Sequence, residues 1–479
     1  MDQQKQESFT KEQDQRPSLQ FQAESSTDDS DKSGDYNKIE VPDGGYGWFI
    51  VLAVFLYNFC TWGANSGYAV YLAHYLQYNS FPPGNKLDYA AIGGFAFGCG
   101  LLFSPIITWF TYITSVRLVI GIGILLQCAA LLLAAFSKKL WQIYLTQGVL
   151  ISFGLAFVSI PSITLLPQWF RKKRSLAQGL GAAGSGLGGI IFNLAMQRMI
   201  EIRNVKWALI VQCIICTVLS SVALTLTRTR QSAIRKDSQG TFKLFDWQVC
   251  RSLGTWLTIF WVCFTMFGYV VLLYSLSAFT VSLGYSSKQG SIVSCMVSVG
   301  ALFGRPVVGY LSDIFGPITV SIVVHMVVAI FSWAMWIPCR NFATALVFAL
   351  IQGSLMGSIW PLSGTIVTRV VGLPKLNVTF SLVWMFLAAF GIISPIIGLE
   401  LRTSNSKSGN NFVHTAIFVG FGYFGAALCL WLLRGYIIAR DELAAEAKTG
   451  FDDGELHLTV NQRDLIKGLF RTGKLHRKV

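Results

Sequence analysis

The sequence predicts an all-α membrane protein with twelve transmembrane helices in two six-helix bundles. Hydrophobic residues make up 53% of its 479 residues and charged residues only 13%. The apolar residues also gather in runs long enough to cross a bilayer, which a water-soluble domain would not need. The formal net charge of +14 could indicate nucleic-acid binding. The basic residues lie between the apolar runs and in the tails, however, as expected for a protein beside a charged membrane surface and not for one that binds nucleic acid.

Residues 1–42 are rich in Gln, Asp, Ser and Lys, and we expect them to form a disordered cytoplasmic tail. The first apolar run begins too late and is too long for a secretory signal peptide. It is the first of six windows of about 20 apolar residues that form a predicted N-terminal bundle over 43–226. The six predicted spans are 48–69, 90–111, 116–136, 140–166, 176–196 and 207–225.

A polar and basic stretch follows, predicted as a central cytoplasmic loop over 227–252. A second set of six apolar windows then forms a predicted C-terminal bundle over 253–438. The predicted spans are 253–276, 290–311, 318–337, 342–364, 378–399 and 412–438. Residues 439–479 are predicted as a cytoplasmic tail, which either lies on the anionic inner leaflet or is solvated.

The distribution of positive charge indicates the orientation. Basic residues crowd the short loop 171–174 and the central loop, which an even number of spans places on the same side as both tails. Loops rich in Lys and Arg stay in the cytoplasm. The opposite loops also carry Lys138, Lys139 and Arg203, so the orientation depends on the density of the basic clusters.

Two motifs refine the prediction. The first, VPDGGYGW at 41–48, places Asp43 where a carboxylate can meet the positive end of the first helix. This string resembles the first-helix signature of the monocarboxylate transporter family, within the major facilitator superfamily. The second, FRKKRSLAQGLGAAG at 170–184, resembles the fifth-helix signature of that family, with Gly181 where alanine is usual.

The resemblance covers about residues 41–440 and is greatest to the fungal homologues of that family. It implies the major facilitator fold, with two halves that move around a site near the bilayer midplane. We therefore expect a multi-pass secondary transporter that moves a small organic solute by alternating access, through symport or facilitated diffusion, with an organic anion of the carboxylate class as the leading substrate. We expect the plasma membrane by resemblance, although a vacuolar or other internal membrane would need the same spans. We expect a monomer whose partners are its substrate and the bilayer.

Residues 309–316, GYLSDIFG, lie at the end of the eighth predicted span and just after it. They resemble the loop motif of the superfamily, in which glycines permit a tight turn and an acid holds neighbouring helix ends in one conformational state. Asp313 and Gly309 are therefore candidate gating residues, together with Asp43. The alternative for Asp313 is an ordinary acid at a helix end.

Arg305 is the only residue inside the eighth predicted span that carries a formal charge. A helical periodicity places Ser294, Ser298, Ala301 and Arg305 on one face, which would line a cavity. In the family, an arginine of this helix is associated with the substrate carboxylate, and Arg305 matches its position ahead of a proline. A guanidinium suits bidentate carboxylate recognition. The alternative is that Arg305, near the end of its span, extends to the lipid headgroups.

Two departures limit the resemblance. Proton-coupled members have an aspartate one turn before the arginine, where this chain has Ala301. They also have a lysine in the first helix, at the position of Ser66. The resemblance therefore does not extend to a lactate or pyruvate assignment or to proton coupling.

The first predicted span is neutral where it would line the site. Asn58, Thr61, Trp62 and Asn65 share one helical face. This face would suit a larger or partly neutral solute, such as a vitamin, or it could join neighbouring helices through polar side chains. Tyr269, Tyr274, Trp360 and Trp384 are weaker candidates of the same kind.

The sequence contains no pattern for catalysis, for a metal or for a cofactor. The ten cysteines are scattered, most of them inside the apolar segments, and imply no disulfide framework. His325 stands alone in the ninth predicted span, and we interpret it as a hydrogen-bonded residue between helices in preference to a proton relay. A nutrient sensor built on a transporter scaffold is the alternative from another class of function, although neither tail has the pattern of a folded domain.

Overall fold

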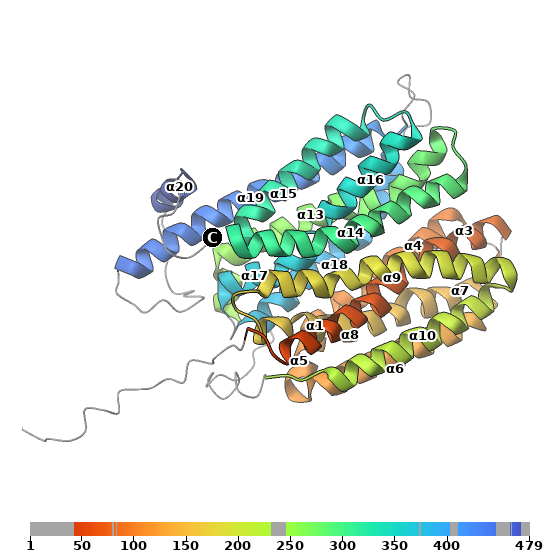
Figure 1. The fold of residues 1–479 in the computed structure, drawn as a ribbon, viewed down its shortest axis with the longest axis horizontal. Helices are drawn as coiled ribbons and strands as arrows, with labels where there is room; N and C mark the ends of the chain where they lie inside the picture. Colours follow the sequence, from red (N-terminus) through yellow and green to blue (C-terminus); the bar gives the residue numbers. More distant parts are fainter. Residues whose placement is uncertain are drawn as a thin grey trace, which may run out of the picture. The chain divides into compact units, whose positions relative to one another are not determined.

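The computed structural model describes residues 43–78, 81–82, 84–230, 246–372, 375–402, 411–446, 460 and 462–470. All regular secondary structure in these ranges is helical (Figure 1). The predicted tail at 1–42, the middle of the predicted central loop and most of the C-terminal tail lie outside the described residues. We call 43–230 the N-terminal half and 246–470 the C-terminal half.

The N-terminal half begins with a long helical segment that is interrupted by one wide turn. The π-helix η1 separates α1 from α2, and a second π-helix, η2, separates α7 from α8. The elements are α1 (Gly47–Asn58), η1 (Phe59–Gly63), α2 (Ala64–Ser66), α3 (Tyr68–Tyr78), α4 (Lys86–Leu102), α5 (Ser104–Ile113), α6 (Val116–Ala135), α7 (Leu140–Ile143), η2 (Tyr144–Leu150), α8 (Ile151–Ile163), the 3-10 turn η3 (Leu166–Gln168), α9 (Arg174–Ile202) and α10 (Val205–Leu226).

Side chains that accept from backbone N–H groups fix several helix starts. Ser115 accepts from Leu118 N at the start of α6, and Asn204 accepts from Trp207 N at the start of α10. The elements of the C-terminal half are α12 (Trp247–Arg251), α13 (Leu253–Ser282), α14 (Ser287–Phe315), α15 (Pro317–Phe331), the π-helix η4 (Ser332–Trp336), α16 (Phe342–Met356), α17 (Ile359–Val371), α18 (Leu376–Glu400), α19 (Val413–Glu446) and α20 (Gln462–Phe470).

Eleven helical segments of the described chain are long and apolar enough to cross a membrane. The number becomes twelve when the pair Leu87–Leu102 and Ser104–Ile113, bent by 45°, is counted as one span. Pro105 lies in the first turn of α5 and has no N–H to continue the helix across this bend. Each of the twelve predicted spans overlaps one of these segments. The prediction of an all-α, multi-pass membrane fold is therefore confirmed.

The two halves meet along α9 and α14, which lie side by side in Figure 1. Glycines permit this close approach, because a Cβ at Gly186 would lie 2.7 Å from the backbone nitrogen of Leu302. Gly309 serves the same contact, facing the backbone of Ser175. It does not form the predicted turn, because α14 continues to Phe315 and the chain turns at Gly316, with φ 97°.

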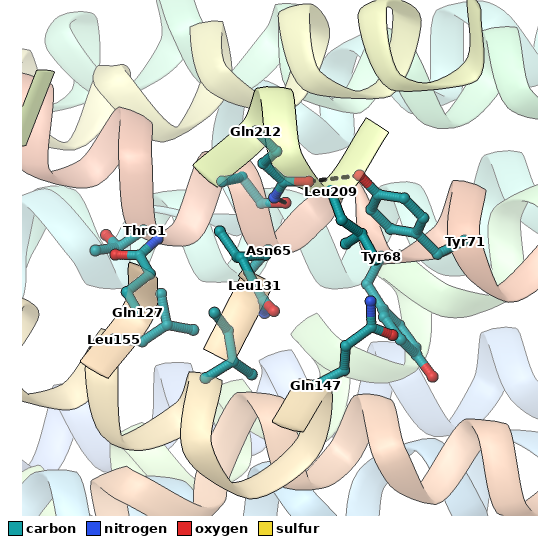
Figure 2. A pocket seen from close by; sticks show the side chains of 12 residues that line it. Thr61, Asn65, Tyr68, Tyr71, Gln127, Leu131, Gln147, Leu155, Leu209 and Gln212 are labelled. Atoms are coloured by element: carbon teal, nitrogen blue, oxygen red, sulfur yellow. Dashed lines mark hydrogen bonds between the residues drawn. The ribbon is translucent and has the colours of Figure 1, made fainter. Parts of the chain in front are cut away.

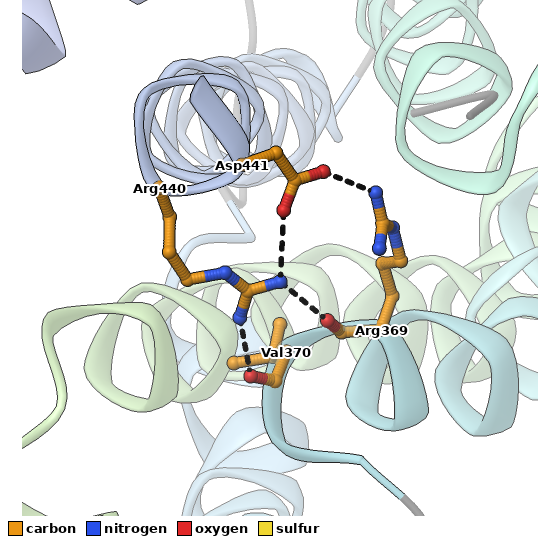
Figure 3. Close-up of polar contacts among 4 residues, drawn as sticks. All are labelled: Arg369, Val370, Arg440 and Asp441. Atoms are coloured by element: carbon orange, nitrogen blue, oxygen red, sulfur yellow. Dashed lines mark hydrogen bonds and ion pairs between the residues drawn. The ribbon is translucent and has the colours of Figure 1, made fainter. Parts of the chain in front are cut away.

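The last long helix, α19, continues past the predicted end of its span to Glu446. The reason is a buried cluster of charged groups in which Arg440 and Asp441 face the end of α17 (Figure 3). Arg440 donates to the carbonyl oxygens of Val370 and Arg369, and Asp441 pairs with the Arg369 side chain. Basic groups at a helix C-terminus satisfy its free carbonyls.

The described part of the C-terminal tail includes α20, which packs on α19. The two helices meet where Gly468 faces the backbone of Gly435, and Leu469 covers Gly435. Residues 462–470 are thus held against α19 by close backbone contact, which the sequence did not indicate.

Candidate functional site

Arg305 is buried inside the protein, with 5% of its surface exposed. It lies on α14, and its Nη1 donates to the carbonyl oxygen of Ala182 at 2.7 Å and to the Ser185 hydroxyl, both on α9. Gly357, just after α16, faces the guanidinium, which leaves room for it. Arg305 therefore joins the two halves and does not extend to lipid headgroups in this conformation.

The guanidinium has no acidic partner. No ion pair among the described residues includes Arg305, and its Nε is buried without a hydrogen-bond partner. The phenol of Tyr269, on α13, interacts with the same guanidinium. A buried cation held only by neutral groups is costly, so the site is suited to receive an anion.

Next to this cation lies a set of rings that we call the aromatic cluster. Trp62 is the central member from the N-terminal half, with ring centroids 5.4 Å from Phe97 and 5.6 Å from Trp360. Trp360 also stacks on Trp384 at 5.5 Å and lies 6.2 Å from Tyr269. Tyr269 belongs to both the cluster and the arginine site, so it connects the two.

The four residues predicted to share a face of the first span divide between two places. Trp62 enters the aromatic cluster, whereas Thr61 and Asn65 line a cavity inside the N-terminal half. Asn58 donates to Val54 O of its own helix. The π-helix η1 explains the division, since its wider turn changes the direction in which successive side chains point.

The cavity of the N-terminal half is small, and its largely apolar wall carries several uncharged polar groups (Figure 2). It offers about 30 Å³, room for one or two water molecules. Gln127, Gln147 and Gln212 bring amide groups to its wall, and the Tyr71 hydroxyl donates to Gln212 Oε1 at 2.7 Å. The π-helices η1 and η2 both contribute to its lining.

The predicted polar stripe of α14 faces α9 and not an open cavity. The Ser298 hydroxyl lies against Gly189, whose Cβ would approach it to 2.8 Å, and Ser294 is half-buried. Ala301 is buried on the same helix. Ser66 donates to Gly63 O of its own segment at 2.7 Å.

The predicted gating acids both bind backbone N–H groups near the start of α9. Asp313 Oδ1 accepts from Ser175 N at 3.0 Å, and Oδ2 accepts from Leu176 N at 2.9 Å. Asp313 thus binds the positive end of a helix that belongs to the other half. Asp43, with φ 52°, accepts from Arg171 N and Lys172 N at 2.6 and 2.7 Å. We call this end of the protein, with its basic loop, the Asp313 end.

His325 lies away from these residues and is fully buried. Its Nδ1 donates to Ser321 O at 2.7 Å, and its Nε2 accepts from Trp261 Nε1 at 3.1 Å. This pattern fixes a neutral ring between α13 and α15, in agreement with the interpretation of a hydrogen-bonded residue between helices.

The sequence missed the partners of Arg305 on α9 and the role of Phe97. Ala182 contributes a backbone oxygen, which no side-chain pattern can indicate. Ser185 lies in a run of small residues that indicates only close helix packing.

Comparison with known proteins gives a family for this chain. Residues 50–395 match the model of the Major Facilitator Superfamily. The probable transporter MCH2 of Saccharomyces cerevisiae is 62% identical over 442 residues, which cover 92% of this chain and 93% of MCH2. The uncharacterized transporter ESBP6 of the same yeast is 32% identical over 85% of this chain and 62% of its own length.

Solved structures agree on the fold. The transporter FucP of this superfamily, crystallised in the outward conformation, superposes with a TM-score of 0.60. The match covers 80% of this chain and 98% of FucP, at 15% sequence identity. The family resemblance given by the two motifs is therefore confirmed, and so is the fold that it implied.

Proposed function

This chain belongs to the major facilitator superfamily, and we propose that it is a secondary transporter that moves a small organic anion of the carboxylate class. Transport follows alternating access around Arg305. The observation that carries the proposal is the buried guanidinium of Arg305, which has an unpartnered Nε and no acidic partner among the described residues. A carboxylate would supply the missing charge and accept from both edges of the guanidinium.

Arg305 also supports a link between binding and movement. In this conformation its Nη1 is bound to Ala182 and Ser185 of the other half. A carboxylate that takes these hydrogen bonds releases α14 from α9 at the centre of the contact. Binding energy at the site is thereby used to change the relative stability of two conformations.

We propose that the Asp313 end faces the cytoplasm. Arg171, Lys172 and Lys173 are exposed there, in agreement with the tendency of basic loops to remain inside. The contact of Asp313 with α9 then closes the cytoplasmic side, and opening to that side requires it to break. By resemblance we assign the protein to the plasma membrane.

The test is uptake by proteoliposomes that contain purified protein. We expect saturable uptake of at least one member of a panel of radiolabelled mono- and dicarboxylates, and its loss in Arg305→Ala. Each charge-assisted hydrogen bond contributes about 1.5–3 kcal/mol. The loss of a single such bond to the substrate would therefore raise KM by about tenfold or more. Arg198→Ala is the matched control, because Arg198 is an exposed arginine on α9. Anion uptake that survives Arg305→Ala would refute the counter-charge role.

We further expect uptake that an inward proton gradient does not accelerate. Ala301 and Ser66 occupy the positions of the acid and the lysine of proton-coupled relatives, and neither side chain gains or loses a proton at physiological pH. Acceleration of uptake by the gradient would contradict this part of the proposal.

A second candidate is a facilitator of a neutral metabolite. The cavity of the N-terminal half favours it, since the polar groups of its wall, such as Asn65 and Gln127, are uncharged. This candidate predicts that Gln127→Leu reduces uptake of a neutral solute while Arg305→Ala does not. The reverse result would favour the anion transporter.

A further inference from the structure

We propose that the transported anion carries an aromatic or heteroaromatic ring, which inserts between Trp62 and Trp360 while Arg305 and Tyr269 hold its acidic group. This inference rests on the proposed function and specifies the substrate class of the same site. It starts from the position of Trp360, whose backbone N–H donates to Gly357 O, the residue that faces the Arg305 guanidinium. The Trp360 ring centroid also lies 6.2 Å from that of Tyr269. Any substituent on a bound carboxylate therefore lies next to the aromatic cluster.

The unpartnered polar atoms of the site are donors. Arg305 Nε and Trp62 Nε1 are buried without hydrogen-bond partners, and both are N–H groups that cannot accept. Leaving a buried donor unpaired is unfavourable, so a ligand rich in acceptor oxygens or ring nitrogens gains more here than one rich in hydroxyl groups that must donate. The two donors come from different halves, and a ligand that bound both would join α14 to the first helical segment.

The division of the cluster between the halves indicates where a ring enters. Trp62 belongs to the N-terminal half, whereas Trp360 and Trp384 belong to the C-terminal half and stack on each other at 22° between planes. The contact between Trp62 and Trp360, with centroids 5.6 Å apart, is the one that must open when the halves separate. Opening it exposes a flat indole face on each side.

When the two halves close around the bound anion, the aromatic cluster favours an anion that carries an aromatic ring. Trp62 and Trp360 contact each other directly, so a guest between them removes a ring–ring contact. An aromatic guest restores such a contact on both of its faces, whereas a saturated guest of the same size restores only apolar burial. This difference corresponds to a preference of about three- to tenfold for the aromatic guest.

The test compares benzoate with cyclohexanecarboxylate, which share charge and ring size and differ in aromaticity. Equilibrium binding to purified full-length protein is measured by calorimetry at neutral pH, because the protonated acids cross bilayers unaided. We expect benzoate to bind about three- to tenfold more tightly than cyclohexanecarboxylate. We expect Trp360→Leu to abolish this preference and Trp360→Phe, which keeps a ring, to retain most of it. Trp207→Leu, at an exposed tryptophan of α10, is the control.

The outcomes separate the two proposals. Equal binding of both carboxylates, with both lost in Arg305→Ala, overturns the aromatic substrate and leaves the anion transporter standing. A preference for benzoate that persists in Trp360→Leu also overturns the inference. Binding that does not depend on Arg305 overturns both. If Trp360→Leu does not fold, the wild-type comparison and Trp360→Phe still decide.

Discussion

Replacing Asp313 by asparagine should open the Asp313 end. The carboxylate of Asp313 accepts from Ser175 N and Leu176 N at 3.0 and 2.9 Å. Each charge-assisted bond of this kind contributes about 1.5–3 kcal/mol. Asparagine keeps one acceptor oxygen, but its amide nitrogen would point a donor at a donor. One of the two hydrogen bonds is therefore lost, and in the other a neutral amide oxygen replaces the charged carboxylate oxygen as the acceptor.

We take about 2 kcal/mol, in the lower half of this range, because Asp313 is only half-buried and partly screened by solvent. This free energy corresponds to about a 30-fold increase in the population in which α14 is separated from α9. The observable is the reactivity of a thiol introduced by Ser175→Cys in a background without the native cysteines. Ser175 is fully buried against α14 and keeps its backbone N–H in this variant.

We expect Asp313→Asn to raise the rate of thiol modification about 30-fold. Glu201→Gln, which removes an exposed acid at the other end of α9, should leave the rate unchanged. An unchanged rate in Asp313→Asn would show that this carboxylate does not hold the halves together. Equal acceleration by Glu201→Gln would attribute the effect to net charge instead.

Three further substitutions test the packing that surrounds the site. Gly179→Val should prevent the close approach of α9 and α14, because its Cβ would lie 2.5 Å from the backbone oxygen of Arg305. The yield of monodisperse protein should therefore fall sharply. Arg440→Met should destabilise the protein by about 1.5–3 kcal/mol, since it leaves the carbonyl oxygens of Val370 and Arg369 without this donor, and a lower Tm in a thermal melt would record this. Gly468→Val should displace α20 from Gly435 and speed cleavage of the C-terminal tail by trypsin, without changing Tm by more than a few degrees. A tail that is equally resistant to trypsin in the wild-type protein and in Gly468→Val would contradict the observed packing.

The aromatic cluster shows why the site could be predicted only in part. Arg305 was identifiable because a charge inside an apolar run is costly and therefore rare. Trp62, Trp360 and Trp384 were noticed one by one, but tryptophans are frequent in membrane helices for other reasons. The proximity of Trp62 to Trp360 depends on how the two halves pack, and these two residues are separated by almost 300 positions in the chain.

Local irregularities also limited the predictions. A regular helix would have kept Asn58, Thr61, Trp62 and Asn65 on one face. The π-helix η1 sends Trp62 towards the aromatic cluster and Asn65 towards the cavity. Similarly, the charges of Arg440 and Asp441 favoured a tail that begins at 439. The sequence does not show that Arg440 binds the last carbonyl oxygens of α17 and is therefore buried.

The sequence by itself determined the helical membrane fold, the positions of its spans and the isolated cation of α14. Apolar length and the cost of charge in lipid act locally along the chain, so they can be read from it directly. Only the tertiary structure decided that Arg305 and Asp313 both bind α9, and that Tyr269 connects Arg305 to the aromatic cluster. These contacts arise from close helix packing through glycines, which brings together backbone groups and rings whose positions no local pattern records.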